Sequence, residues 1–189
     1  MVHGRWNYRR ISATAVYSFY KNITLYIIEL WFAMYNYWSG QVIYERWTIG
    51  MYNVFFTSAP PVALGLFDRS CSAETREMYP SLYHSTQNSE LFNLREFWKW
   101  IGISLFHSVL LFWLPQMAME FGLSWPSGVG DGYLVLGNTV YTMVVITTCL
   151  KAGIEMDAWT WFSHASIWGS ILLWFFVFIN RELSSPKQL

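Results

Sequence analysis

Charged residues are scarce in this chain, and cysteine is almost absent. Of 189 residues, 13% are charged, and the two cysteines, Cys71 and Cys149, lie far apart. Soluble domains carry about 25% charged residues, and two distant cysteines do not make a disulfide scaffold. The formal net charge is zero, so no basic surplus attracts nucleic acid. Since 54% of the residues are hydrophobic and 20% aromatic, disorder is excluded and an integral membrane protein is indicated.

Catalytic and cofactor-binding patterns are also missing. The sequence has no glycine-rich phosphate loop and no nucleophile elbow. Its His and Cys residues lack the spacing of a metal site, and His107 and His164 are more typical of satisfied core histidines than of ligands. We therefore predict no catalytic residue, no metal site and no cofactor bound by this chain, and no nucleic-acid partner.

Long apolar runs predict an all-α integral membrane protein, with one transmembrane domain over residues 1–189 and five transmembrane helices. A helix needs about 20 apolar residues to cross the hydrocarbon core. One run, residues 11–35, is long enough but contains Lys21 and Glu29. Four further windows are uncharged, at residues 47–67, 100–119, 132–150 and 158–180.

The distribution of Lys and Arg predicts a cytosolic N-terminus, because cytosolic loops carry an excess of positive charge. Residues 68–99 then form a cytosolic loop, whose mixed composition suggests order. Arg181 and Lys187 fall on the outer side, where they fit the rule poorly. The cytosolic segments hold Arg5, Arg9, Arg10, Arg69, Arg76, Arg95, Lys99 and Lys151.

Polar side chains at membrane depth mark a candidate site. Lys21 and Asn22 lie near the middle of the first run. A charge there costs about 3 kcal/mol or more unless it faces a cavity, a partner or a transport pathway. A transport site and a buried structural pair with Glu29 both remain open, although eight positions place Glu29 about 12 Å away along the helix axis, too far for direct contact.

The second run contains Asn53, Thr57 and the adjacent prolines Pro60 and Pro61. Two prolines remove two backbone donors and break a helix locally. Broken helices in transporters expose backbone groups to a cavity near the middle of the membrane. The break therefore predicts either part of a transport path or a kink that only shapes packing.

Several blocks of residues match the pattern of a known family in the right order. They include Phe19-Tyr20-Lys21-Asn22, Tyr44-Glu45-Arg46-Trp47, Tyr52-Asn53-Val54-Phe55-Phe56-Thr57, Pro60-Pro61, Phe106-His107-Ser108-Val109, Val144-Val145-Ile146-Thr147, Cys149-Leu150-Lys151-Ala152-Gly153 and Trp159-Thr160-Trp161-Phe162. Over about residues 2–178 the chain resembles type-IV P-type ATPases, the phospholipid flippases. It is most similar to the branch that moves aminophospholipids such as phosphatidylserine.

The resemblance implies that the five spans correspond to the fifth to ninth membrane helices of a flippase. It implies that Lys21, Asn22 and Asn53 line the path of the lipid headgroup. An ammonium and two carboxamides suit an anionic serine or phosphate group midway across the membrane. The implied lipids are phosphatidylserine and phosphatidylethanolamine, moved to the cytosolic leaflet. Candidate supporting residues are Glu29, Thr57, Pro60 and Pro61.

The same resemblance implies a small accessory subunit with two membrane spans, which would dock on the outer loops at residues 36–46 and 120–131. It also implies residence in a Golgi, endosomal or plasma membrane. The family's phosphorylated Asp-Lys-Thr-Gly motif does not occur in this chain. ATP and Mg²⁺ would therefore bind to domains absent here, and we expect the chain alone not to hydrolyse ATP usefully.

Two functions stay open on the sequence. The chain is either the transport part of an aminophospholipid flippase, or a truncated non-catalytic paralogue or isoform that binds lipid or the accessory subunit without pumping. The length of the native polypeptide separates them. An unrelated channel or secondary transporter has little support, because no internal repeat and no charged pore ring is visible.

Overall fold

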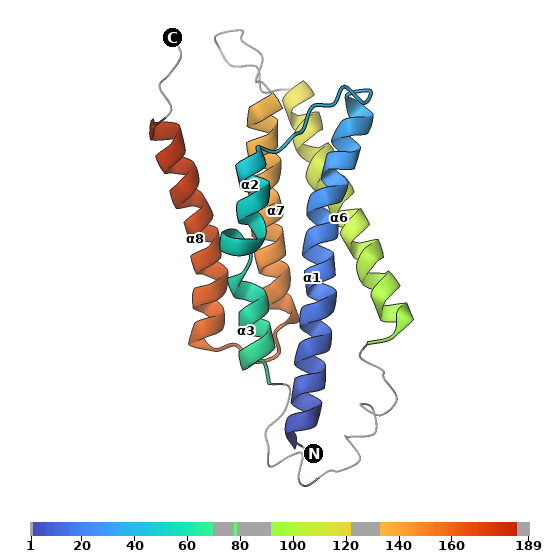
Figure 1. The fold of residues 1–189 in the computed structure, drawn as a ribbon, viewed down its shortest axis with the longest axis vertical. Coiled ribbons are helices and arrows are strands. Elements are labelled where there is room, and N and C mark those ends of the chain that lie inside the picture. Colours follow the sequence, from blue (N-terminus) through green and yellow to red (C-terminus); the bar gives the residue numbers. More distant parts are fainter. Residues whose placement is uncertain (1, 70–77, 79–91, 122–132, 185–189) are drawn as a thin grey trace.

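Helices form the framework of the described part of this protein. The computed structural model describes residues 2–69, 78, 92–121 and 133–184, and no strand occurs among them. The prediction of an all-α fold is confirmed for these residues. Figure 1 shows the long helices beside a broken column of short ones. The elements are α1 (Val2–Tyr35), α2 (Arg46–Met51), η1 (Tyr52–Phe56), α3 (Ala59–Phe67), α6 (Leu94–Phe121), α7 (Tyr133–Glu155) and α8 (Trp161–Ser184).

Within the described residues, three helices are long and apolar enough to cross a membrane. The predicted windows at 100–119, 132–150 and 158–180 each fall on one of them. All three helices run beyond their windows into charged sequence, because an apolar window marks the hydrocarbon core rather than the helix ends. The three candidate spans are Leu94–Glu120, Tyr133–Glu155 and Trp161–Arg181.

The other two expected spans differ from the prediction of five transmembrane helices. The run at 11–35 lies inside α1, a continuous helix of 34 residues, but its charged and polar residues keep it outside the set that qualifies by composition. The run at 47–67 is divided into α2, η1 and α3, with 6, 5 and 9 residues. Even nine helical residues rise only about 14 Å, less than the hydrocarbon core of about 30 Å. Within the described residues, three spans rather than five therefore qualify as single helices.

The break in the column lies at Thr57 and Ser58, directly before the two prolines. Thr57 has φ −131° and ψ 21°, outside the helical region, and α3 begins at Ala59 with both prolines in its first turn. Proline is tolerated there because the first N–H groups of a helix have no intrahelical partner. The predicted interruption of the second run is therefore confirmed.

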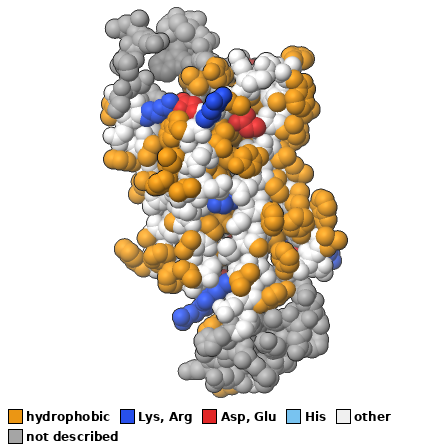
Figure 2. Space-filling model, in the orientation of Figure 1, with side chains coloured by type: hydrophobic (Ala, Val, Ile, Leu, Met, Phe, Trp, Pro, Cys, Tyr) orange, Lys and Arg blue, Asp and Glu red, His pale blue; other side chains and the backbone are white. Residues whose placement is uncertain are grey.

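Aromatic side chains fill the interior between the column, α7 and α8. The Tyr141 ring centroid lies 6.0 Å from that of Tyr52, 6.3 Å from that of Phe56 and 4.5 Å from that of Trp174. All four side chains are buried, and the Tyr141 hydroxyl donates to the carbonyl of Thr48 at 2.8 Å. Many other large apolar side chains are exposed on the outside, and Figure 2 shows them spread over one face, as suits a surface that faces lipid tails.

The lower end of the bundle in Figure 1 is held together by a carboxylate. Asp68, just after α3, is buried, and its Oδ1 accepts from the backbone N–H groups of Asp157 and Ala158 at 2.9 and 3.0 Å. Arg9 of α1 forms an ion pair with Asp157. These contacts tie the start of α1 and the end of α3 to the connection between α7 and α8.

Arg181, which fits the charge rule poorly, has a specific partner at the other end. Its guanidinium forms an ion pair with Glu45 and lies 5.0 Å from the ring centroid of Trp47. The Trp47 indole N–H donates to the same carboxylate at 2.5 Å. Local pairing with the start of α2 thus accounts for an arginine at this position.

Parts of two predicted loops lie outside the described residues. In the expected cytosolic loop at 68–99 these are residues 70–77 and 79–91, which include Cys71 and Arg76, while α6 already begins at Leu94. In the expected outer loop at 120–131 they are residues 122–131, and Lys187 also lies outside. The predictions for these positions remain predictions.

Candidate functional site

The side chain of Lys21 ends at the break in the column. It is only 6% exposed, and its Nζ donates to the Thr57 carbonyl oxygen at 3.0 Å and to Thr57 Oγ1 at 3.2 Å. The Thr57 hydroxyl donates its own proton to the Tyr52 carbonyl at 2.7 Å, so its oxygen can accept from the ammonium. The break therefore supplies the acceptors for a buried cation carried by α1.

Tyr52, at the start of η1 and before the break, also contacts Lys21. Its hydroxyl donates to the backbone carbonyl of Lys21 at 3.2 Å. The Nζ of Lys21 also lies 5.9 Å from the Tyr52 ring centroid, at the outer limit for attraction between a cation and an aromatic face. Sequence reasoning missed Tyr52, and its place beside Asn53 in a matched block is the signal that could have found it.

Glu29 is not the partner of Lys21. Its carboxylate accepts from the backbone N–H groups of Ile43 at 3.3 Å and Tyr44 at 3.4 Å. The interpretation of Lys21 and Glu29 as a buried structural pair is therefore wrong. Glu29 instead holds the segment between α1 and α2 against α1, away from the break.

The carboxamides of Asn22 and Asn53 have unused hydrogen-bonding capacity. Asn22 Oδ1 is buried and has no hydrogen-bond partner among the residues that the structure describes, although an asparagine oxygen can accept two hydrogen bonds. Asn53 is half-buried in η1 and makes no side-chain hydrogen bond to another described residue. The structure thus joins Lys21 to Thr57, but within the described residues no hydrogen bond links either asparagine to Lys21.

An apolar groove of about 530 Å³ runs along α1 and α3 beside the break. Pro61 contributes to its wall, whereas Pro60 is buried. The Ser18 hydroxyl in the wall is already committed to the carbonyl of Thr14 at 2.7 Å. A polar break next to an apolar groove suits an amphiphilic molecule. The groove is lined by Ile11, Thr14, Ala15, Ser18, Pro61, Val62, Gly65 and Leu66.

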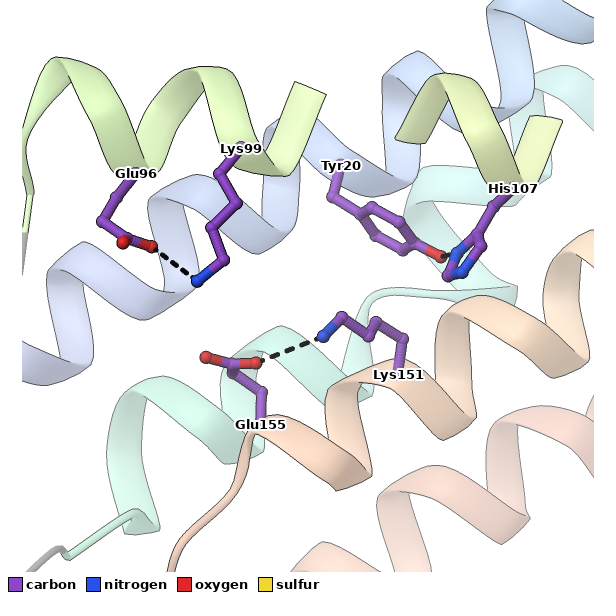
Figure 3. A network of polar contacts seen from close by, with 6 residues as sticks. All are labelled: Tyr20, Glu96, Lys99, His107, Lys151 and Glu155. Carbon is purple, nitrogen blue, oxygen red and sulfur yellow. Dashed lines mark hydrogen bonds and ion pairs between the residues drawn. The ribbon is translucent and has the colours of Figure 1, made fainter. Parts of the chain in front are cut away.

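The Tyr20 hydroxyl and His107 Nδ1 lie 2.6 Å apart between α1 and α6 (Figure 3). His107 thus has a hydrogen-bond partner, as predicted for a structural histidine. His164 is exposed, with its ring centroid 4.6 Å from that of Trp159, so its prediction as a core residue is wrong. Nowhere in the described part of the chain do three His, Cys, Asp or Glu side chains form a group that could hold a metal ion.

Two ion pairs complete the network in Figure 3. Lys151 pairs with Glu155 at 3.5 Å, and Lys99 pairs with Glu96 at 3.2 Å. A pocket of about 250 Å³ beside them is lined by both glutamates and Arg9, which is itself paired with an aspartate. Because each of these charges already has a partner of opposite sign, the pocket offers a ligand fewer unused polar groups than the break does.

Comparisons of the sequence with known proteins show to which family the chain is similar. The sequence pattern of the family described as phospholipid-translocating P-type ATPase C-terminal matches residues 1–187. Phospholipid-transporting ATPase tat-1 of Caenorhabditis elegans is 52% identical over 186 residues, which are 98% of this chain and 16% of that protein. Phospholipid-transporting ATPase DRS2 of Saccharomyces cerevisiae is 40% identical over 180 residues, 94% of this chain and 13% of that protein.

A third relative agrees with these two. Phospholipid-transporting ATPase C887.12 of Schizosaccharomyces pombe is 43% identical over 174 residues, which are 92% of this chain and 14% of that protein. The chain therefore spans between 13% and 16% of the length of the three relatives. Similarity covers nearly all of this sequence but only a small part of each relative.

Proposed function

Because the chain belongs to the family of phospholipid-translocating P-type ATPases, matching its C-terminal region over residues 1–187, we propose that it is the membrane-embedded part of an ATP-driven flippase. The pump would move phosphatidylserine and phosphatidylethanolamine from the outer or lumenal leaflet to the cytosolic leaflet. The observation that carries the proposal is 52% identity over 98% of the chain to a protein named as a phospholipid-transporting ATPase. Three membrane-length helices and an apolar outer surface support the same assignment.

The proposal includes five membrane crossings with a cytosolic N-terminus. The first would be α1, whose 34 residues rise about 51 Å, more than the hydrocarbon core of about 30 Å. The second would be the column of α2, η1 and α3. Non-helical backbone is tolerated at membrane depth where protein surrounds it, and Thr57 at the break is fully buried.

The lipid headgroup would bind between α1 and the column, at the break in the column. Lys21 supplies an ammonium for the phosphate, and charge-assisted hydrogen bonds are about twice as strong as neutral ones. The unused oxygen of Asn22 and the carboxamide of Asn53 offer partners to the remaining polar groups of the headgroup. Without such partners, burying a charged headgroup costs several kcal/mol. The apolar groove along α1 and α3 offers apolar surroundings to the adjoining part of the lipid.

ATP hydrolysis would take place outside these residues. The chain has neither a phosphate loop nor the Asp-Lys-Thr-Gly motif, and no acidic cluster in its described part fits Mg²⁺. In this proposal the present residues bind and orient the lipid, while domains elsewhere in a longer polypeptide supply the energy. The chain alone would then show no useful ATPase activity.

We place the accessory subunit on the outer ends of these helices. The segment at 36–46 is the described part of that surface, and Glu29 fixes its backbone at Ile43 and Tyr44. A fixed loop suits a partner whose two membrane spans lie beside these helices and which also contacts their outer ends. The host membrane in this proposal is that of the Golgi, the endosomes or the cell surface.

An antibody against a peptide of this chain, used on a blot of native membranes, tests the proposal. A flippase requires a polypeptide on the order of a thousand residues, since 186 residues are 16% of one relative. That polypeptide, once purified, should hydrolyse ATP faster when phosphatidylserine is added. A band near 22.2 kDa, the mass of this chain, without lipid-stimulated ATPase activity would contradict it. Such a band favours a short protein that binds lipid or the accessory subunit without pumping.

A further inference from the structure

The two prolines leave two backbone carbonyls without a helical partner. In an uninterrupted helix the carbonyls of Phe56 and Thr57 would accept from the N–H groups four residues on. Those positions are Pro60 and Pro61, and proline has no N–H to donate. In the described residues these two carbonyls accept instead from side chains of α7 and α1.

The two substitute donors are of very different strength. The Phe56 carbonyl faces the thiol of Cys149 at 3.9 Å, and a thiol is a weak donor. The Thr57 carbonyl accepts from the Lys21 ammonium at 3.0 Å, which is a charge-assisted hydrogen bond. Only at Thr57 does a strong and exchangeable donor stand in for the missing backbone N–H.

Lys21 uses two of its three N–H groups on Thr57. A phosphate that draws the ammonium away from Thr57, rather than only accepting from the third N–H, would leave the Thr57 carbonyl without its donor. Thr57 is fully buried, and an unsatisfied buried acceptor is costly. The lipid that displaces Lys21 must therefore supply a new donor, or the site is destabilised. A primary amine in the same headgroup can do this, since its ammonium has three N–H groups. A trimethylated amine has none.

We propose that the Thr57 carbonyl is a specificity-determining acceptor, kept available by Pro61, which selects headgroups that carry both a phosphate and an N–H donor. The inference rests on the proposed function and adds a reason for headgroup choice. The phosphate replaces Thr57 as the acceptor for Lys21, and the headgroup amine replaces Lys21 as the donor to Thr57. A choline headgroup completes only the first exchange. Sites built to hydrogen-bond a polar group reject analogues that lack it.

The first test uses the complete polypeptide and four lipids that differ only in methylation. Lipid-stimulated ATPase activity is titrated with phosphatidylethanolamine, its N-methyl and N,N-dimethyl derivatives, and phosphatidylcholine. The half-saturating concentrations of phosphatidylethanolamine and of its N-methyl and N,N-dimethyl derivatives should be similar, because each of these lipids keeps at least one N–H. The half-saturating concentration of phosphatidylcholine should be about tenfold higher, which is the loss of affinity expected when a buried acceptor loses its hydrogen-bond partner. An even rise with each methyl group, or no preference, would overturn the inference.

Two proline variants form the second test. Pro61→Ala provides an N–H four residues after Thr57, so the carbonyl no longer depends on the lipid amine. The preference for phosphatidylethanolamine over phosphatidylcholine should then fall at least threefold. Pro60→Ala is the matched control, because it restores a donor only for the Phe56 carbonyl. Its lipid preference should stay within about twofold of the unaltered protein.

The outcomes separate this inference from the proposed function. Lipid-stimulated activity with an unchanged preference in Pro61→Ala would overturn the role of Thr57 and leave the flippase assignment intact. An equal loss of preference in Pro60→Ala and Pro61→Ala would also overturn it, because a general change in the helix break would then be the cause. Absence of any lipid-stimulated activity in the unaltered protein would overturn both.

Discussion

Lys21 and Thr57 are joined by two hydrogen bonds, although they lie 36 positions apart and on different helical elements. The acceptor is available because the column is interrupted at this residue. A cation that is costly in apolar surroundings is thus satisfied by backbone that a regular helix would have used internally. One local irregularity thus accounts for the burial of Lys21.

The first prediction separates the role of Lys21 in stability from its role in lipid binding. Lys21→Met removes the donor to Thr57 but also relieves the desolvation of an ammonium, so the two effects on unfolding oppose each other. Pro61→Ala offers Thr57 a new donor. It should raise the free energy of unfolding of the Lys21→Met protein by about 1 kcal/mol more than it raises that of the unaltered protein. Thermal unfolding in detergent measures this coupling.

Affinity should respond differently from stability in the same variants. Lys21→Met should raise the half-saturating concentration of phosphatidylserine about tenfold, because a hydrogen bond between charged groups is lost. Pro61→Ala should not restore that loss. Recovery of lipid affinity together with stability in the double variant would mean that Lys21 acts only by holding the break together.

The second prediction concerns Gly137, where α7 approaches the segment between α1 and α2. A Cβ atom built there would lie 2.2 Å from the carbonyl oxygen of Ile43, so Gly137→Ala should lower the free energy of unfolding by about 1–3 kcal/mol. Gly169→Ala on α8 is the control, since its Cβ would meet nothing within 4 Å. Equal melting temperatures for the two variants would show that the approach is not as close as described.

The third prediction concerns the segment held by Glu29. Glu29→Gln keeps the size of the side chain but removes the charge that strengthens its bonds to Ile43 and Tyr44. Hydrogen exchange in a peptide covering residues 36–45 should become several-fold faster. Glu96→Gln, in the first turn of α6, should leave that peptide unchanged. Unaltered exchange in Glu29→Gln would remove the basis for a fixed docking loop.

The fourth prediction concerns membrane orientation. Cys71 belongs to the segment expected in the cytosol, so an impermeant thiol reagent should label it only after the membrane is permeabilised. Ser39→Cys, between α1 and α2, should be labelled in intact cells. Cys149 is buried and should stay unreactive in both cases. Labelling of Cys71 in intact cells would reverse the topology that the charge distribution predicts.

Much of the framework could be predicted from the sequence because apolar run length is a local property. The windows at 100–119, 132–150 and 158–180 fall on helices for that reason, and Pro60 and Pro61 identified the interruption. Helix count was less predictable. Whether a run such as 47–67 forms one helix or three depends on where its freed backbone groups find partners, which run length does not report.

The candidate site was predictable as a set of residues but not as a set of contacts. Lys21 stood out because its charge lies in an apolar run. Its acceptor is mostly backbone, however, and any residue at position 57 has a carbonyl, so no side-chain pattern indicates it. Charge pairing suggested Glu29 instead, and that interpretation was wrong because Glu29 binds backbone N–H groups nearer its own end of α1.

The most direct test of the central claim is lipid movement across a membrane. The complete polypeptide that contains this chain is reconstituted in liposomes with fluorescent phosphatidylserine, and dithionite bleaching measures the leaflet distribution before and after ATP is added. We expect ATP-dependent transfer of the lipid, and at low lipid concentration Lys21→Met should slow that transfer about tenfold. Absence of ATP-dependent transfer in the unaltered protein, or equal transfer in Lys21→Met, would contradict the account.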